Sequence, residues 1–300
     1  MNAESPVIEI NELKRRFGRV EAVNGLSLVV EAGRCYGLFG RNGAGKTTTI
    51  KCLLNLLRPQ GGSVRVFGME PRKNEVTVKA RLSYVPDLVA FYPWMTVREV
   101  LNYFASFRRY WNSKTERDLL ERFDLDSGRK ATSLSKGQKT QLALIAAISP
   151  EPDLLILDEP TSGLDPIVRR EFIETVIGAY QAGGDKPRTI FVSTHLISEF
   201  EGLIDRFTII DKGRELLTMD ADQARARFRR IHVRFPDEPP RLDLTGALRV
   251  REDGRDMEVL VNGGAERVIE VLRANAGEVL RSESLSLEEI FLAANVPPGN

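Results

Sequence analysis

The sequence contains little cysteine and little histidine: two residues of each type occur among 300. Two cysteines are too few for a disulfide framework. Cys35 falls in an apolar run and Cys52 in a stretch that reads as a helix, so neither has the close spacing of a metal-ligand set. This scarcity predicts a reduced, cytoplasmic environment and argues against the disulfide-rich secreted class.

A surplus of charge is also missing. The 43 Lys and Arg residues nearly balance the 42 Asp and Glu residues, which leaves a net charge of +1. A balanced chain has no overall electrostatic attraction to nucleic acid or to an anionic membrane surface. A local basic run over residues 225–230 is predicted to form the solvated face of a helix. We therefore expect no nucleic-acid partner.

Long apolar runs are absent as well. No segment approaches the roughly 18 uninterrupted apolar residues of a membrane-spanning helix. Residues 1–7 lack the basic region and apolar region of a secretory signal. We expect a chain that neither crosses a membrane nor leaves the cell unaided, although it could dock on a membrane protein.

What the sequence does contain is an alternation of strands and helices that suits two domains. Residues 154–158 form a nearly continuous apolar run, which is typical of a strand buried on both faces of a parallel sheet. Residues 71–149 are mostly helical in pattern, with helices expected at 97–110 and 139–148. Short strands and helices follow residue 220, and the last helix is expected at 287–295. We predict an α/β domain over 1–220, with a mixed sheet and a helical subdomain at about 71–149. A small α+β domain is predicted over 221–300.

The most informative segment is residues 40–47, which read Gly-Arg-Asn-Gly-Ala-Gly-Lys-Thr and fit the phosphate-loop pattern G-x-x-x-x-G-K-[ST]. A predicted strand precedes this segment and a predicted helix over residues 48–57 follows it. The glycines let successive N–H groups point inward, and the helix dipole adds about half a positive charge. The predicted nucleoside triphosphate contacts are Gly40, Arg41, Asn42, Gly43, Ala44, Gly45, Lys46, Thr47 and Thr48. Lys46 is expected to reach the β- and γ-phosphates, and the Thr47 hydroxyl to bind Mg²⁺.

Two acidic residues, Asp158 and Glu159, end the apolar run at 154–158. Asp158 is placed to bind the Mg²⁺ water shell. Glu159 is placed to polarise an attacking water as a general base. The alternative is an ordinary loop start, but a phosphate loop in the same chain favours the catalytic interpretation.

A second helix start is predicted at residues 134–138, which read Leu-Ser-Lys-Gly-Gln. Ser135 is a suitable N-cap residue, and Gly137 lets another group approach the backbone closely. Such a helix N-terminus suits a phosphate group, although a single site needs only one. By itself the segment indicates only where a helix begins.

The sequence resembles the ATP-binding-cassette ATPases in the order of five motifs. They are the phosphate loop, residues 134–138, residues 158–161, residues 162–165 and residues 193–195. The resemblance covers about residues 6–216. It implies a P-loop cassette that dimerises head to tail with two ATP molecules between the subunits. It also explains the spare helix N-terminus, because these residues of one subunit would contact the nucleotide of the other.

The resemblance assigns a role to several further residues. Ser135, Gly137 and Gln138 belong to the segment expected at the partner's nucleotide. His195 is expected to bind the γ-phosphate and the attacking water, and Asp165 to communicate across the dimer. Phe17 matches the aromatic residue that stacks on adenine. Without the resemblance, a lone histidine such as His195 after a strand is more often structural. For Phe17 the alternative is a core aromatic.

Two positions depart from the family pattern. Asp87 stands where a glutamine usually bridges the metal or the attacking water to the helical subdomain. An aspartate there either coordinates Mg²⁺ or turns away from Asp158 and Glu159. Lys136 stands where glycine is commonest, which is a milder change because Ser135 and Gly137 remain.

The expected function is ATP hydrolysis that drives transport through separate integral membrane subunits, and the expected direction is export. Residues 91–100 look like the cassette surface that receives such a subunit; the alternative is that Phe91 and Trp94 belong to the core. Residues 285–292 resemble the tail of the drug- and antibiotic-export branch. The cassette would pair with itself or with a sister chain, on the cytoplasmic face of the membrane. A soluble cassette ATPase and a regulatory half of a heterodimer are the alternatives.

Overall fold

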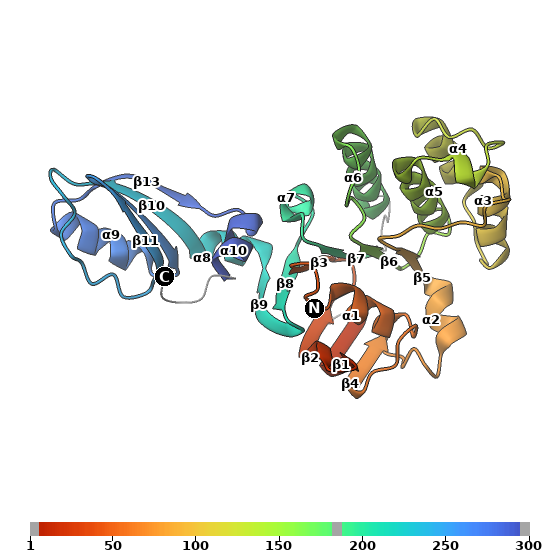
Figure 1. Cartoon of the computed structure of the whole chain (residues 1–300), viewed down its shortest axis with the longest axis horizontal. Helices are drawn as coiled ribbons and strands as arrows, with labels where there is room; N and C mark the ends of the chain where they lie inside the picture. Colours follow the sequence, from red (N-terminus) through yellow and green to blue (C-terminus); the bar gives the residue numbers. More distant parts are fainter. Residues whose placement is uncertain (1–5, 182–187, 295–300) are drawn as a thin grey trace. The chain divides into compact units, whose positions relative to one another are not determined.

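A computed structural model describes residues 6–181 and 188–294 of the chain (Figure 1). The chain divides into two compact units, Met1–Thr218 and Met219–Asn300. Each unit has sheets and helices of its own.

A six-stranded sheet forms the centre of the first unit. Its strands, in spatial order, are β5 (Leu82–Val85), β6 (Leu154–Asp158), β7 (Thr189–Thr194), β3 (Cys35–Gly40), β8 (Arg206–Asp211) and β9 (Arg214–Asp220). The pairs from β5 through β8 are parallel. Every residue of β3, β6 and β7 is buried, as the continuous apolar run at 154–158 predicts for a strand covered on both faces.

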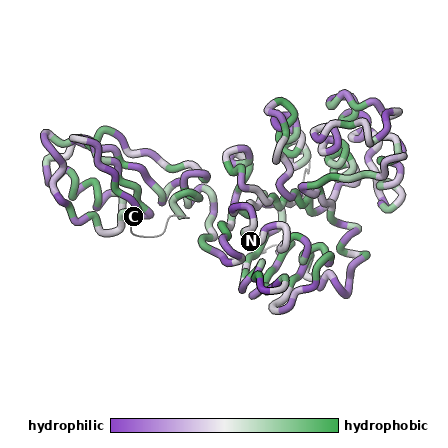
Figure 2. The backbone as a smooth tube through the Cα atoms, viewed as in Figure 1, coloured by the Kyte–Doolittle hydropathy of each residue, from purple (hydrophilic) through white to green (hydrophobic). Residues whose placement is uncertain are grey.

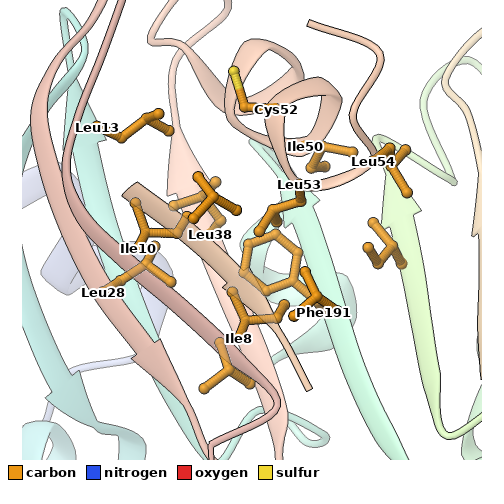
Figure 3. Packing of buried hydrophobic residues seen from close by; sticks show 14 of the residues in the cluster. Ile8, Ile10, Leu13, Leu28, Leu38, Ile50, Cys52, Leu53, Leu54 and Phe191 are labelled. Atoms are coloured by element: carbon orange, nitrogen blue, oxygen red, sulfur yellow. The ribbon is translucent and has the colours of Figure 1, made fainter. Parts of the chain in front are cut away.

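A three-stranded antiparallel sheet packs against this central sheet together with the helix α1 (Lys46–Leu53). Its strands are β2 (Val20–Val30), β1 (Ile8–Phe17) and β4 (Gly61–Val66). Figure 3 shows Ile8 and Ile10 of β1 facing Leu53 of α1 and Phe191 of β7. This core fixes α1 on the sheet, and the phosphate loop lies between β3 and α1.

The helices between β5 and β6 form the predicted helical part of the unit (Figure 1). They are α3 (Val97–Ser106), α4 (Ser113–Arg122) and α5 (Lys136–Ile148), and the short α2 (Glu75–Arg81) precedes β5. Further along the chain, α6 (Pro166–Gln181) follows β6 and α7 (Ile197–Phe200) follows β7. Within the described residues, no helix is long and apolar enough to cross a membrane.

Several predicted helix boundaries were wrong, including those of α1 and α3. The helix after the phosphate loop begins at Lys46, two residues before the predicted start, because Gly45 already serves as its N-cap. The helix α3 ends at Ser106 rather than at Tyr110, and Phe107 is its C-cap. Propensity cannot locate either end, since caps depend on the backbone conformation of one residue.

The second unit contains an antiparallel sheet in the order β11 (Ala247–Asp253), β12 (Asp256–Asn262), β10 (Phe228–Arg234) and β13 (Glu278–Ser284). Figure 2 shows hydrophobic and hydrophilic residues mixed along this sheet. The buried residues Ile231, Val233, Val259 and Val261 of the sheet pack in one apolar cluster with α9 (Ala265–Ala274). The helices α8 (Ala221–Arg227) and α10 (Leu287–Ala294) complete the unit. The final helix is predicted to reach Asn295, which lies outside the described residues.

The basic run at 225–230 does not form one solvated helix face. Arg225 and Arg227 end α8, whereas Arg229 and Arg230 lie on β10. Arg230 pairs with Glu289 at 2.7 Å, so its charge is neutralised within the unit. The chain continues here as a strand, and apolar and polar residues alternate with the period of a strand over residues 231–234.

We predict that Phe191→Ala lowers the free energy of unfolding of the first unit by about 3–5 kcal/mol. Phe191 is fully buried, and its ring stacks on that of Tyr36 with 5.9 Å between centroids. Urea unfolding followed by tryptophan fluorescence reports on this unit, because Trp94 and Trp111 both belong to it. The control is Leu56→Ala at a position 56% exposed, which should cost less than about 0.5 kcal/mol. Equal losses in the two variants would contradict the core assignment.

Candidate functional site

The phosphate loop connects the end of β3 to the start of α1. Gly45, its last residue, has φ of +109° and caps the helix. An added Cβ there would lie 2.3 Å from the backbone oxygen of Ala22, so a side chain would force the loop away from the sheet. The loop therefore places the free N–H groups of the first turn of α1 at its mouth, where an anion would bind.

Lys46 connects this loop to the acidic pair. Its Nζ donates to the backbone oxygens of Gly40 at 2.6 Å and Arg41 at 3.2 Å. The same atom lies 2.8 Å from Oε1 of Glu159. Lys46 is only 5% exposed and Glu159 8% exposed, so the two charges compensate each other inside the protein.

Asp158 is the most fully enclosed carboxylate of the site, with no exposed surface. Its Oδ1 accepts hydrogen bonds from Thr47 at 3.1 Å and from Ser193 at 2.5 Å. Its Oδ2 accepts one from the Tyr84 hydroxyl at 3.4 Å. Strand register produces this arrangement, because Asp158 and Ser193 are directly paired at the ends of β6 and β7.

Burial raises the pKa of Asp158, and the hydrogen bonds from Ser193 and Thr47 oppose the shift. The charges of Glu159 and Asp87 add smaller increases to the same pKa. Burial likewise raises the pKa of Tyr84, followed by the charge of Asp158 beside it. The site is therefore a place where negative charge is concentrated and incompletely compensated.

Glu159 has a backbone φ of +46°, a left-handed conformation that is uncommon for a residue with a side chain. The conformation is supported by a hydrogen bond from its N–H to the Ser193 oxygen at 2.9 Å. It directs the side chain between Lys46 and His195, whose Nδ1 lies 2.8 Å from Oε2 of Glu159. Backbone strain of this kind persists where the surrounding structure determines it, and it is concentrated at functional sites.

The oxygen atoms of Thr47 and Asp158 fit a magnesium ion, which prefers a few protein oxygens together with water and phosphate oxygens. Over residues 6–181 and 188–294, no group of three or more His, Cys, Asp and Glu side chains is arranged to bind a metal by itself. Asp87 is partly buried and has no hydrogen bond or ion pair with any described residue, but its charge raises the pKa of Asp158. The oxygen atoms of Thr47 and Asp158 thus suit a cation whose other ligands are water and phosphate oxygens.

The segment at 134–138 begins α5, three residues earlier than the helix predicted from Lys139. Ser135 is its N-cap, as predicted: the hydroxyl accepts from the Gln138 N–H at 3.2 Å, and the Gln138 side chain accepts from the Ser135 N–H at 3.1 Å. This reciprocal capping box satisfies two of the N–H groups at the helix end. Gly137 lies in the first turn beside them.

Asp165 and Phe17 lie on other elements. Oδ1 of Asp165 accepts from the N–H groups of Ile167 and Val168, at 3.1 Å each, and so caps the start of α6. Phe17 ends β1 and is 45% exposed, which excludes a core role for its ring within this unit. The guanidinium of Arg15 lies 4.8 Å from the ring centroid, on one face of it.

The structure therefore brings together Lys46, Thr47, Asp158, Glu159 and His195 by direct contacts. Within the part of the chain that the structure describes, no hydrogen bond or ion pair joins that group to the other predicted residues, which are Phe17, Ser135, Gly137, Gln138 and Asp165. Tyr84 and Ser193 were not predicted as site residues, although both lie in segments that end parallel strands. Their positions at the carboxyl ends of β5 and β7, beside Asp158 on β6, are the signal that could have identified them.

A glycine loop at a helix N-terminus, a lysine folded over it and a strand-terminal acidic pair define a P-loop nucleoside triphosphatase. The family model for the ABC transporter matches residues 23–162. The chain belongs to this family, as an ATP-binding and ATP-hydrolysing subunit.

Relatives and a solved structure agree with this assignment. The Nod factor export ATP-binding protein I of Burkholderia lata is 38% identical over 217 residues, which are 70% of this chain and 69% of the relative. The daunorubicin resistance ATP-binding protein DrrA3 of Streptomyces coeruleorubidus is 32% identical over 303 residues, 95% of this chain and 94% of the relative. A solved ATP-binding subunit of an ABC transporter is 29% identical with a TM-score of 0.66, and covers 73% of this chain and 92% of that one.

We predict that Asp158→Asn stabilises the nucleotide-free protein at neutral pH. Because burial raises the pKa of Asp158, its ionised form costs folding free energy once the pH exceeds the ordinary carboxyl pKa of about 3.9. The neutral amide avoids this cost. The gain should therefore be present at pH 7 and should vanish as the pH falls below about 4, where the carboxyl is protonated in both states.

Urea unfolding at several pH values measures this effect. Asp118→Asn, which removes an exposed carboxylate from α4, is the matched control and should change stability little at any pH. A loss of stability in Asp158→Asn at pH 7, or a gain that does not depend on pH, would show that burial does not govern this carboxylate.

Proposed function

We propose that this chain is the ATPase subunit of an exporter whose transport path lies in separate membrane subunits. Residues 1–220 would bind and hydrolyse ATP, with about 71–149 as the helical subdomain, and residues 221–300 would form an accessory domain. The observation that carries the proposal is the contact of Glu159 with both Lys46 and His195 at the mouth of the phosphate loop. Through that contact Lys46, which is expected to bind the phosphates of ATP, lies directly beside the candidate base.

In this proposal Glu159 accepts a proton from the attacking water, and His195 orients that water and the γ-phosphate. Lys46 would leave Glu159 for the β- and γ-phosphates when ATP binds, which frees the carboxylate to act as a base. Thr47 and Asp158, with Asp87 nearby, would bind Mg²⁺. When bound, the ion supplies positive charge that stabilises the phosphoryl oxygens.

The proposed dimer would use two helix N-termini of each chain for the nucleotides. The N-terminus of α1 serves the phosphate loop, and the capped N-terminus of α5, with Ser135, Gly137 and Gln138, serves the nucleotide of a second cassette. Asp165 would lie at the same interface, and the exposed face of Phe17 would stack on adenine. The second cassette is another copy of this chain or a sister chain.

The membrane partner would dock on the exposed aromatic residues of the helical subdomain. Tyr92 is 49% and Trp94 66% exposed, and their rings stack with 4.9 Å between centroids. Phe91 is only partly buried and packs edge-on against Phe104. Exposed aromatic groups of this density are typical of a protein interface. Because the named relatives include a Nod factor export protein and a daunorubicin resistance protein, the direction is proposed to be export.

This docking would place the chain on the cytoplasmic face of the cell membrane. The accessory domain is included in the alignment with the daunorubicin resistance relative, which extends over 95% of the chain. The second unit contains none of the predicted catalytic residues, so a regulatory or dimer-stabilising role is proposed for it.

The proposal is tested by purifying the tagged chain from detergent-solubilised membranes of its native host. A polytopic membrane protein at about one-to-one stoichiometry is expected with the wild-type chain. Trp94→Ala should reduce the recovered partner at least about tenfold, since an interface aromatic contributes about 2 kcal/mol or more. Tyr110→Ala, at an exposed aromatic outside the stacked pair, is the control. Recovery from the soluble fraction alone would exclude the transport role.

We predict that Glu159→Gln lowers the ATP turnover number about 10²–10⁴-fold, because it removes the general base and keeps the size of the side chain. ATP binding should persist, and the variant should accumulate as an ATP-bound dimer. Lys46→Ala should instead lose ATP binding itself. Steady-state turnover and equilibrium binding separate the two variants. Turnover of Glu159→Gln within tenfold of wild type would remove Glu159 from the base role.

A further inference from the structure

Two residues beyond Glu159 begins a segment whose contacts hold it on two sides. This segment, residues 161–165, links the candidate base to Asp165 at the start of α6. On one side, the Thr161 hydroxyl donates to Glu199 of α7. Glu199 also pairs with Arg169 of α6 at 2.7 Å.

Arg169 contacts the segment directly as well, since its guanidinium donates to the backbone oxygen of Leu164 at 3.1 Å. Glu199 is largely buried, with only 10% of its side chain exposed, so this network is protected from water. It fixes one side of the segment to α6 and α7.

On the other side, the segment is held by Lys136, the first residue of α5. Its Nζ donates to the backbone oxygen of Ser162 at 2.6 Å. Gly163 makes room for this contact: its φ is +69°, and an added Cβ would lie 2.8 Å from the lysine Nζ and 3.8 Å from its Cε. The lysine side chain therefore crosses the bare α-carbon of Gly163 to reach the carbonyl before it.

Ser162 continues the connection to the candidate base. Its backbone N–H donates to the backbone oxygen of Glu159 at 3.1 Å. Ser162 thus accepts a hydrogen bond from Lys136 through its backbone oxygen and donates one to Glu159 through its backbone N–H. Glu159 has a strained φ of +46°, so its orientation depends on such supporting contacts.

We propose that Lys136 is a positioning residue for ATP hydrolysis, which ties the start of α5 through Ser162 to the backbone of Glu159. This inference rests on the proposed function, in which Ser135 and Gly137 beside it receive the nucleotide of a second cassette. Arrival of that nucleotide would act on the orientation of Glu159 in the first site. The family pattern places glycine at position 136, which has no side chain to make this link.

The lysine acts through the segment and not on the nucleotide. A charge-assisted hydrogen bond to a carbonyl contributes more than a neutral one, and its loss leaves ATP binding at the phosphate loop intact. The helices α5 and α6 remain attached in its absence, because Gln141 donates to Glu171 at 3.0 Å. Removing the ammonium should therefore impair turnover without unfolding the unit.

The test compares Lys136→Met with Lys136→Arg in the full chain. Lys136→Met keeps the aliphatic side chain, removes the donor and should lower the turnover number about five- to tenfold. The affinity for ATP, measured by equilibrium binding, should stay within twofold of wild type. Lys136→Arg retains a cation and should recover most of the turnover. Lys114→Met, an exposed lysine on α4 for which no side-chain contact is described, should match wild type.

A second variant keeps the inference testable if Lys136→Met folds poorly. Gly163→Asn adds a side chain where the lysine crosses, at a φ that asparagine tolerates. It should lower turnover to a similar extent, and the double variant should be no worse than either single one, because both break the same contact.

The outcomes distinguish this inference from the proposed function. Turnover of Lys136→Met equal to that of Lys114→Met would overturn the positioning role while leaving the ATPase intact. A loss of ATP affinity in Lys136→Met, with turnover at saturation unchanged, would place the lysine on the nucleotide instead and also overturn it. Absence of hydrolysis in the wild-type chain would count against the proposed function before any variant is compared.

Discussion

The site depends on the parallel register of β6 with β7 and of β7 with β3. Parallel strands end at the same edge of a sheet, so residues far apart in the sequence become neighbours there. Register pairs Asp158 with Ser193 and Phe39 with Thr194, which places the acidic pair, the serine and the start of the phosphate loop in one row. A shift of either pair would separate Asp158 from Thr47 and remove the loop from the candidate base.

The carboxylates at this edge are enclosed at a cost in folding free energy. Asp158 has no exposed surface and accepts hydrogen bonds from hydroxyl groups in place of water, while Glu159 pairs with Lys46. Burying carboxylates costs folding free energy unless they are compensated, and here compensation is incomplete for Asp158. The apolar core around Phe191 stabilises the fold beneath them. A nucleotide with its cation would supply the missing positive charge, so binding and charge compensation coincide.

Local sequence patterns predicted much of this arrangement. The phosphate loop, the buried strand ending in Asp158 and the N-cap at Ser135 each depend on neighbouring residues, and each lies where its pattern indicates. Helix ends were less predictable, as α1 and α3 show, because a cap depends on one backbone conformation. The prediction for the basic run at 225–230 was wrong because composition suggested one helix, whereas Arg229 and Arg230 belong to the strand that continues through the alternating residues 231–234.

The sequence by itself determined the chemistry that this protein carries: a phosphate-binding loop, an acidic pair, a second helix N-terminus and the family to which their order belongs. Only the tertiary structure decided which groups meet. Thr47 and Asp158 are 111 positions apart, Tyr84 and Asp158 74, and Lys136 and Ser162 26. Such contacts follow from strand order, register and helix packing, which no local pattern encodes. For this reason the identity of the site could be read from the chain, whereas the link from Lys136 to Glu159 required the folded molecule.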